Sequence, residues 1–179
     1  MIKNKGRILV DHCYEKNLIF DQKKNEEWFF TISRYIKIFD LFKKNNINIF
    51  TNDLISEADT NFNIQIDFKC LPNPIKKNYL IVNEPSLINP SNHDIEILKK
   101  FDLVFTWNDD VKGENIIKIN LPYDFENTKI YENHSNEGYL LVCSNLKSTK
   151  SYENYSIRNM VVNFFEDKYL RFHLYGKGW

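Results

Sequence analysis

The sequence predicts an α/β protein with a Rossmann-like, mostly parallel sheet and helices on both faces. Three observations support this fold class. Short, continuously apolar runs at 79–82 and 103–107 are typical of strands that are buried on both sides. Apolar residues at helical spacing occur between such runs, most clearly at 28–44 and 155–168. Strands that alternate with helices along a chain indicate parallel pairing.

The first half of the chain predicts one long helix between strands. An apolar strand at 8–10 precedes the helical pattern of 28–44, and Asn45-Asn46 ends that helix before a strand at 47–50. The alternating apolar and polar residues of 64–68 are typical of an edge strand. Pro72 and Pro74 mark the loop that follows.

The second half predicts a regular series of elements. Ser91 resembles the start of a capping box for a short helix, and further strands are expected at 116–119, 139–143 and 172–175. The 155–168 helix is expected to bury Ile157, Met160, Val161, Phe164 and Phe165. The buried centre of the sheet is expected to contain Leu80, Val82, Val104, Phe105, Leu141 and Val142.

Composition narrows the class of protein. The 179 residues are 42% hydrophobic and 27% charged, which is typical of a globular chain with a buried core. Lys+Arg and Asp+Glu both number 24, so no basic excess favours nucleic-acid or anionic-membrane binding. The apolar stretch at 8–10 is too short for a signal peptide or a membrane span. Three cysteines without a C-x-x-C pair favour a reducing, cytoplasmic location.

Common cofactor and metal motifs are missing from the sequence. It contains neither a G-x-G-x-x-G fingerprint nor a P-loop, and its four histidines lack the spacing of a zinc site. Asn108-Asp109-Asp110 offers an acidic pair at a predicted strand end, which fits a metal-binding pair or an ordinary solvated turn. We therefore predict no resident cofactor and no metal site.

Two charged residues stand at positions that suit chemistry. Glu84 directly follows the 79–82 strand, where ligands bind in open α/β sheets, so it is a candidate general base or an ordinary loop carboxylate. Arg158 lies near the start of a predicted helix, where a guanidinium suits a phosphate group or a surface ion pair.

Four segments in order resemble family-ten glycosyltransferases, the α-1,3/1,4-fucosyltransferases and their bacterial relatives. The first is the strand that ends at Asn83-Glu84-Pro85-Ser86, and the second runs from Phe101 through Trp107 to Leu121-Pro122-Tyr123. The third joins Ser144-Asn145 to Ser156-Ile157-Arg158-Asn159, and the fourth is Leu174-Tyr175-Gly176-Lys177-Gly178-Trp179. The resemblance covers about residues 79–179, whereas residues 1–78 fit by topology alone.

The resemblance implies an inverting transferase with two Rossmann-like domains, of the GT-B type. It assigns the acceptor-activating base to Glu84, donor binding to Arg158 and Asn145, and the acceptor cleft to Trp107, Asn108 and Asp109. The substrates would be a GDP-sugar and a glycan hydroxyl, with no metal required. Residues 1–150 would form the acceptor-side domain and 151–179 the junction with a donor domain. Since the chain stops directly after a predicted strand, we expect a fragment that lacks most of the donor site and is inactive by itself.

Two other classes of protein remain open at this point. The chain could be a non-catalytic module that binds sugars or nucleotides. It could also be a regulatory or interaction domain in which Glu84 and Arg158 are surface residues.

Overall fold

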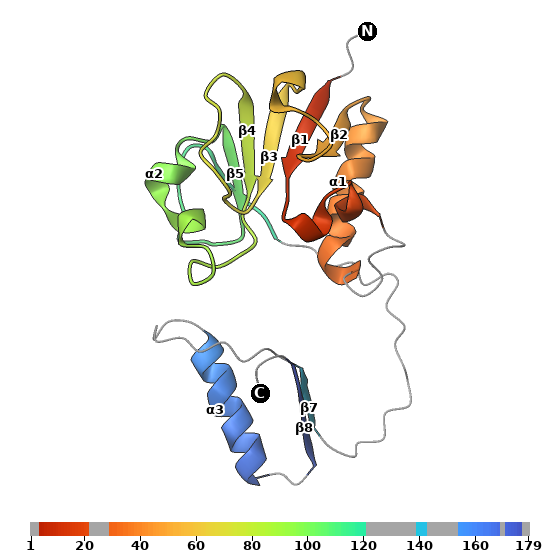
Figure 1. Cartoon of the computed structure of the whole chain (residues 1–179). Helices are drawn as coiled ribbons and strands as arrows, with labels where there is room; N and C mark the ends of the chain where they lie inside the picture. Colours follow the sequence, from red (N-terminus) through yellow and green to blue (C-terminus); the bar gives the residue numbers. More distant parts are fainter. Residues whose placement is uncertain (1–3, 22–28, 121–138, 143–153, 169–170, 177–179) are drawn as a thin grey trace. The chain divides into compact units, whose positions relative to one another are not determined.

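The computed structural model describes residues 4–21, 29–120, 139–142, 154–168 and 171–176 (Figure 1). The chain divides into two compact units, Met1–Thr128 (unit 1) and Lys129–Trp179 (unit 2). The division at residue 150 that the sequence suggested falls within unit 2. Each unit is described by itself.

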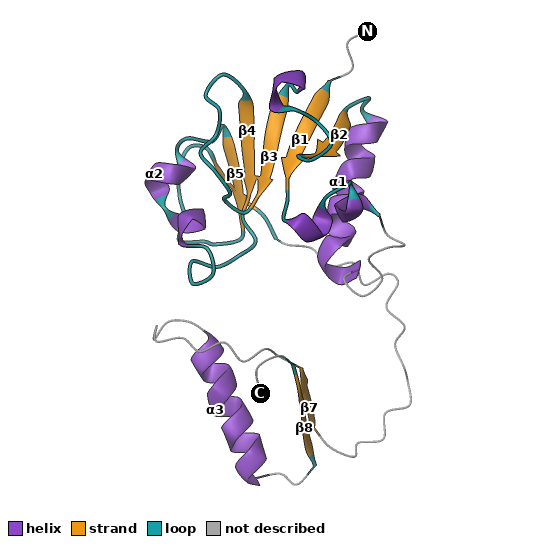
Figure 2. Cartoon of the chain, viewed as in Figure 1, coloured by secondary structure: helices purple, strands orange, loops and turns teal. Residues whose placement is uncertain are grey.

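Unit 1 is built on a six-stranded sheet in which every neighbouring pair is parallel (Figure 2). The strand order is β2-β1-β3-β4-β5-β6. Its strands are β1 (Lys5–Leu9), β2 (Asn48–Thr51), β3 (Phe62–Ile66), β4 (Lys77–Ile81), β5 (Leu103–Thr106) and β6 (Ile116–Lys118). Its α-helices are α1 (Phe29–Lys44) and α2 (Ile95–Leu98). Short 3-10 helices also occur in the described residues: η1 (His12–Tyr14), η2 (Leu18–Phe20), η4 (Glu57–Asp59) and η5 (Pro90–His93). The predicted Rossmann-like α/β class is confirmed.

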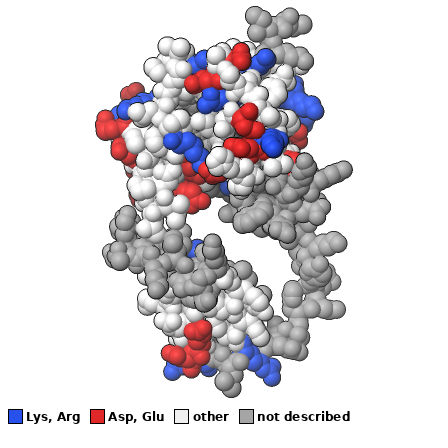
Figure 3. Space-filling view, viewed as in Figure 1, with Lys and Arg blue, Asp and Glu red and all other residues white. Residues whose placement is uncertain are grey.

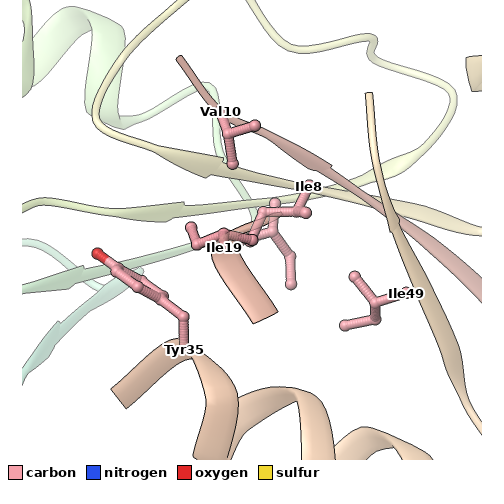
Figure 4. Close-up of a cluster of buried hydrophobic side chains, with 6 residues drawn as sticks. Ile8, Val10, Ile19, Tyr35 and Ile49 are labelled. Carbon is pink, nitrogen blue, oxygen red and sulfur yellow. The ribbon is translucent and has the colours of Figure 1, made fainter. Parts of the chain in front are cut away.

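The two faces of this sheet carry separate apolar cores. One core joins Tyr35 of α1 to Ile8, Ile49 and Ile64 of the strands, together with Val10 and Ile19 (Figure 4). The other joins Leu98 of α2 to Leu80 of β4 and Val104 of β5, together with Val82, Phe101 and Val111. Because successive side chains of a strand point to opposite faces, α1 and α2 cover opposite sides of the sheet.

The end of α1 shows how local chemistry sets the strand that follows. Asn46 adopts a left-handed conformation with φ of 59°, which asparagine tolerates better than most residues. The Ile47 amide then donates to the Phe42 carbonyl at 2.9 Å and closes the helix. The predicted stop at Asn45-Asn46 is confirmed, and β2 begins two residues later.

The prediction that β3 is an edge strand is wrong, because β3 lies between β1 and β4. Its alternation has another origin: one face of β3 carries polar side chains that are themselves buried. Asn63 is 4% exposed, and its amide donates to Glu57 at 2.7 Å. Gln65 is 2% exposed and donates to the Cys70 carbonyl at 2.9 Å. These hydrogen bonds offset much of the cost of burying the two amides, although Oδ1 of Asn63 has no partner within the described residues.

The buried centre of the sheet differs in part from the expected list. Leu80, Val82 and Val104 are fully buried, as predicted. Phe105 is only half-buried, because α1 packs over the β1 and β2 side of its face and leaves β5 partly uncovered (Figure 1). Leu141 in unit 2 is also half-buried, and the side chain of Val142 lies outside the described part of the chain.

The short second helix begins later than the capping box suggested. Residues Pro90–His93 form the 3-10 helix η5, and the Asp94 side chain caps α2 by accepting from the Glu96 amide at 2.9 Å. Aspartate is a favoured N-cap residue, so it takes the role that the sequence had assigned to Ser91.

Unit 2 contains β7 (Tyr139–Val142), α3 (Asn154–Lys168) and β8 (Phe172–Tyr175), with the two strands parallel. The predicted buried face of α3 is wrong for four of its five residues, and only Phe165 packs inward as predicted. Val162 is 1% exposed, and the ring of Phe165 stacks on Phe172 at 5.4 Å between centroids. Ile157, Met160, Val161 and Phe164 lie largely exposed. These four residues lie along one side of α3, next to the side that carries Val162 and Phe165. Both sides have apolar residues at helical spacing, so the spacing alone did not show which side is buried.

Charges on the visible face of unit 1 are of both signs and interspersed, as Figure 3 shows. None of the helices in the described ranges has the length and apolar character that a membrane crossing requires.

Candidate functional site

The candidate site lies at the carboxyl ends of β1, β3 and β4. The chain leaves β1 through α1 to reach β2 on one side, and it then returns to β3 on the other side of β1. The strand order therefore reverses between β1 and β3. In open parallel sheets, ligands bind in the crevice at such a reversal, outside the carboxyl ends of the strands.

A cavity of about 160 Å³ opens at this reversal. The strand ends contribute Asp11, Asp67, Asn83 and Glu84, and α1 contributes Arg34 and Tyr35. Val10, Tyr14, Ile19 and Ile66 complete the lining. The wall thus combines carboxylates, amide and hydroxyl groups and one guanidinium with a few apolar side chains, which is the usual character of a small-molecule pocket.

Asp67 organises the strand ends around this cavity. It is 8% exposed and adopts φ of 57°, a left-handed conformation that aspartate tolerates. Its Oδ1 accepts from the backbone amides of Asn83 at 2.8 Å and Glu84 at 2.9 Å, and from the Asn92 side chain at 2.7 Å. Three donors on one oxygen compensate for the burial of this charge.

Glu84 follows β4 and presents the carboxyl group that the sequence singled out. The residue is exposed and lines the cavity, so its side chain is accessible to a ligand. Partial burial of the carboxyl group raises its pKa above 4.5, and repulsion from Asp67 adds to this effect. Arg34 acts in the opposite direction. A carboxylate with a raised pKa is a stronger base, and such shifts occur often at functional sites.

Part of the cavity wall comes from α1. Tyr35 is 4% exposed, and its hydroxyl accepts a hydrogen bond from the Asn83 side-chain amide at 2.7 Å. Burial raises the pKa of Tyr35, so the phenol stays neutral. The Arg34 guanidinium carbon lies 5.1 Å from the centroid of the same ring. Its Nε and Nη1 are buried and have no hydrogen-bond partner within the described residues. The positive charge of Arg34 favours the ionised form of Glu84.

None of the three residues of the expected acceptor cleft lines the cavity at Glu84, and two of them, Trp107 and Asn108, lie close to the Glu84 backbone. The Trp107 indole donates to the Asn83 carbonyl at 3.0 Å. The Asn108 side chain contacts the His93 ring, and the other nitrogen of that ring contacts the Glu84 carbonyl. Asn108 and Asp109 line a different cavity of about 280 Å³ near β6. Asp109 also pairs with Lys118 at 2.6 Å. The structure thus brings Trp107 and Asn108 close to the Glu84 segment, and it places Asp109 on a separate surface.

The expected donor residues belong to unit 2. Arg158 is an exposed residue of α3, and Asn145 lies outside the described residues. Glu84 belongs to unit 1 and Arg158 to unit 2. The assignment of both residues to one reaction therefore stays a prediction.

Several residues at the site were missed by sequence reasoning. Asp67, Asn92 and His93 all bond to the Glu84 segment, and Arg34 and Tyr35 line the cavity at Glu84. One signal in the sequence could have identified Asp67, because this acid directly follows β3, as Glu84 follows the strand before it. In the described ranges, no group of three or more His, Cys, Asp or Glu side chains is arranged to hold a metal ion.

Comparisons of the chain with protein-family models, with curated proteins and with solved structures found no match.

Proposed function

We propose that unit 1 is the acceptor-binding half of an inverting glycosyltransferase similar to the family-ten enzymes. The observation that supports this proposal is the position of Glu84. A carboxyl group with a raised pKa lines a cavity of mixed polar and apolar character at the point where the strand order reverses.

In this reaction, Glu84 takes the proton from an acceptor hydroxyl. The hydroxyl oxygen forms a bond to the anomeric carbon of a GDP-sugar, and the bond from that carbon to the diphosphate breaks. The nucleoside diphosphate leaves with the electron pair, and the anomeric configuration inverts. Arg158 and Asn145 would bind the diphosphate side, where positive charge stabilises the leaving group.

The chemistry of the cavity wall suits a sugar. A sugar hydroxyl both donates and accepts, so it needs partners of both kinds. Glu84 and Asp11 can accept, and Tyr14 carries a phenol that can do either. Val10 and Ile66 provide apolar surface for the carbon side of a sugar ring. Trp107 and Asn108 would extend the acceptor surface beside the Glu84 segment.

Binding of an acceptor tests the proposal directly. The full chain is titrated with a panel of neutral di- and tetrasaccharides, and amide shifts are followed by NMR. We expect shifts that cluster at Asp11, Tyr35 and Glu84. Glu96→Gln, which changes an exposed acid of α2, is the matched control for Glu84→Gln. The absence of binding across the panel, or shifts confined to other surfaces, would overturn the proposal.

Turnover separates a transferase from a non-catalytic sugar-binding module. In transfer assays with GDP-fucose, Glu84→Gln is expected to lower turnover about 10²- to 10⁴-fold, the usual size of general-base catalysis. Acceptor binding should survive, because glutamine keeps the shape. Unchanged turnover in this variant, or sugar binding without any transfer in the wild type, would contradict the catalytic role.

A further inference from the structure

The carbonyl group of Glu84 is held by residues from two other segments. The Asn92 side chain donates to this oxygen at 3.1 Å, and the His93 Nε2 lies 3.1 Å from it. Asn92 is fully buried, whereas His93 is half-buried and reaches further, toward the turn after β5.

The other ring nitrogen of His93 faces that turn. Its Nδ1 lies 3.1 Å from Nδ2 of Asn108. The orientation of the Asn108 amide is fixed independently, because its Oδ1 accepts from the Asp110 backbone amide at 2.9 Å. Asn108 therefore presents its NH₂ group to the ring, and the His93 Nδ1 must accept.

These contacts determine which nitrogen of His93 carries the proton. An Nδ1 that accepts from an amide is unprotonated, and a neutral imidazole then has its proton on Nε2. That proton is directed at the Glu84 carbonyl, which can only accept. The ring is thus a neutral link with one donor and one acceptor, and both are used.

Trp107 supports the same arrangement from the side. Its ring lies edge-on to His93, with 6.2 Å between centroids and 69° between planes. The Trp107 indole also donates to the carbonyl of Asn83, the residue before Glu84. The turn after β5 is therefore attached to the Asn83–Glu84 segment at two consecutive carbonyls.

We propose that His93 is a positioning residue, which in its neutral Nε2-protonated form ties the Glu84 backbone to the turn at Asn108 and so keeps the Glu84 carboxyl group at the cavity. The effect of His93 on catalysis depends on the function proposed above for Glu84. The link itself does not depend on any substrate, so it is tested separately.

The first measurement is the protonation of the ring. A long-range ¹H–¹⁵N spectrum of the full chain at neutral pH should show His93 with a protonated Nε2 and an unprotonated Nδ1. The opposite form, or rapid averaging of the two, would overturn the proposal. No sugar is present, so a failure here is independent of the function proposed for Glu84.

Two variants separate the two ends of the link. A glutamine can place an NH₂ group near the position of Nε2, so His93→Gln should keep the bond to Glu84. An asparagine can place an oxygen near the position of Nδ1, so His93→Asn should keep the contact with Asn108 and lose the bond to Glu84. His12→Asn changes an exposed histidine that bonds to Glu15, and it serves as the control.

The pKa of the Glu84 carboxyl group shows whether each variant keeps the hydrogen bond to the Glu84 carbonyl. This pKa, read from the pH dependence of the side-chain ¹³C shift, should fall toward the ordinary value in His93→Asn, because the loosened carboxyl group becomes more hydrated. His93→Gln and the His12 control should keep the raised value. A merely structural histidine would change stability in both His93 variants and leave this pKa unchanged, which would contradict the proposal.

If His93→Asn fails to fold, the ring protonation still tests the link, because it is measured on the wild-type chain. In the transfer assay, His93→Asn should lower turnover roughly 10- to 100-fold with little change in acceptor KM, and His93→Gln should recover most of it. Equal turnover in His93→Asn and wild type would exclude the positioning role. By contrast, full turnover in Glu84→Gln would exclude the proposed function itself.

Discussion

The carboxylate of Asp67 accepts a hydrogen bond from the backbone amide of Glu84 at 2.9 Å, although the charge of Asp67 also raises the pKa of the Glu84 carboxyl group. One acid therefore fixes the backbone of the other and opposes its ionisation. This relationship links the stability of the strand ends to the basicity of Glu84.

Replacing Asp67 should reveal how much the strand ends depend on it. In Asp67→Ala the amides of Asn83, Glu84 and Asn92 lose their common acceptor, so we expect a loss of about 3 kcal/mol or more in unfolding free energy. Asp67→Asn keeps one acceptor oxygen and the tolerance for positive φ, so it should lose about half as much. Urea denaturation measures both, and equal losses in the two variants would contradict this account.

The raised pKa of Glu84 predicts a gain in stability when its charge is removed. The fold favours the protonated form, so the contribution of Glu84 is fully favourable below its unfolded pKa and is lost as pH rises through the higher folded pKa. Glu84→Gln should therefore be more stable than wild type at pH 7. Because Glu84 is exposed, the gain should stay below about 1 kcal/mol.

The same variant should lose this advantage in acid. Below about pH 4 the wild-type carboxyl group is protonated in both states, so the two unfolding free energies should converge. Glu96→Gln should bring no gain at pH 7, because Glu96 pairs with Lys99 at 2.7 Å. Thermal unfolding at several pH values tests this, and a constant difference across pH would exclude the electrostatic origin.

Gln65 should hold the loop after β3 against the sheet. Its side chain donates to the Cys70 carbonyl and accepts from the Lys69 amide, both at 2.9 Å. Gln65→Met has a similar shape but leaves these groups without partners, so we expect a loss of about 2 kcal/mol. Limited proteolysis should also cut faster at 67–76. An unchanged cleavage rate would show that the loop does not depend on Gln65.

Gly6 should tolerate no side chain beside Phe62. A Cβ at Gly6 would overlap the Phe62 ring, which also stacks on Phe42 at 5.8 Å between centroids. Gly6→Ala is expected to cost about 1–3 kcal/mol by overpacking. Phe62→Leu alone should also destabilise, but the double variant should lose less than the sum of the two. Strict additivity in a double-mutant cycle would contradict the predicted overlap.

The sequence predicted the sheet well because continuous apolar runs indicate buried parallel strands. It placed β3 wrongly because Asn63 and Gln65 look like solvent-facing residues, whereas both are buried and donate to the Glu57 side chain of η4 and to the Cys70 carbonyl of the following loop. It also chose the wrong stripe of α3. Val162 and Phe165 face the β7–β8 pair, but the exposed stripe beside them is equally apolar.

The site was predicted only where a residue directly follows an obvious strand. Glu84 fits that description, so its place at the cavity could be anticipated. His93 and Asn108 are fifteen positions apart, and their contact depends on how η5 and the turn after β5 meet in three dimensions. Arg34 and Tyr35 look like ordinary helix residues, because which side of α1 faces the strand ends is set by packing.

The buried amides of β3 also make the sheet intolerant of misalignment. A shift of β3 by one residue would turn Asn63 and Gln65 toward the apolar core around Ile8 and Tyr35. Each amide would then lose its partners in a site that offers no replacement, at a cost of about 1–3 kcal/mol apiece. A purely aliphatic β3 would carry no such penalty. The polar residues of β3 thus reduce its hydrophobic burial but favour a single register with its neighbours. We expect this to disfavour misregistered sheets during folding.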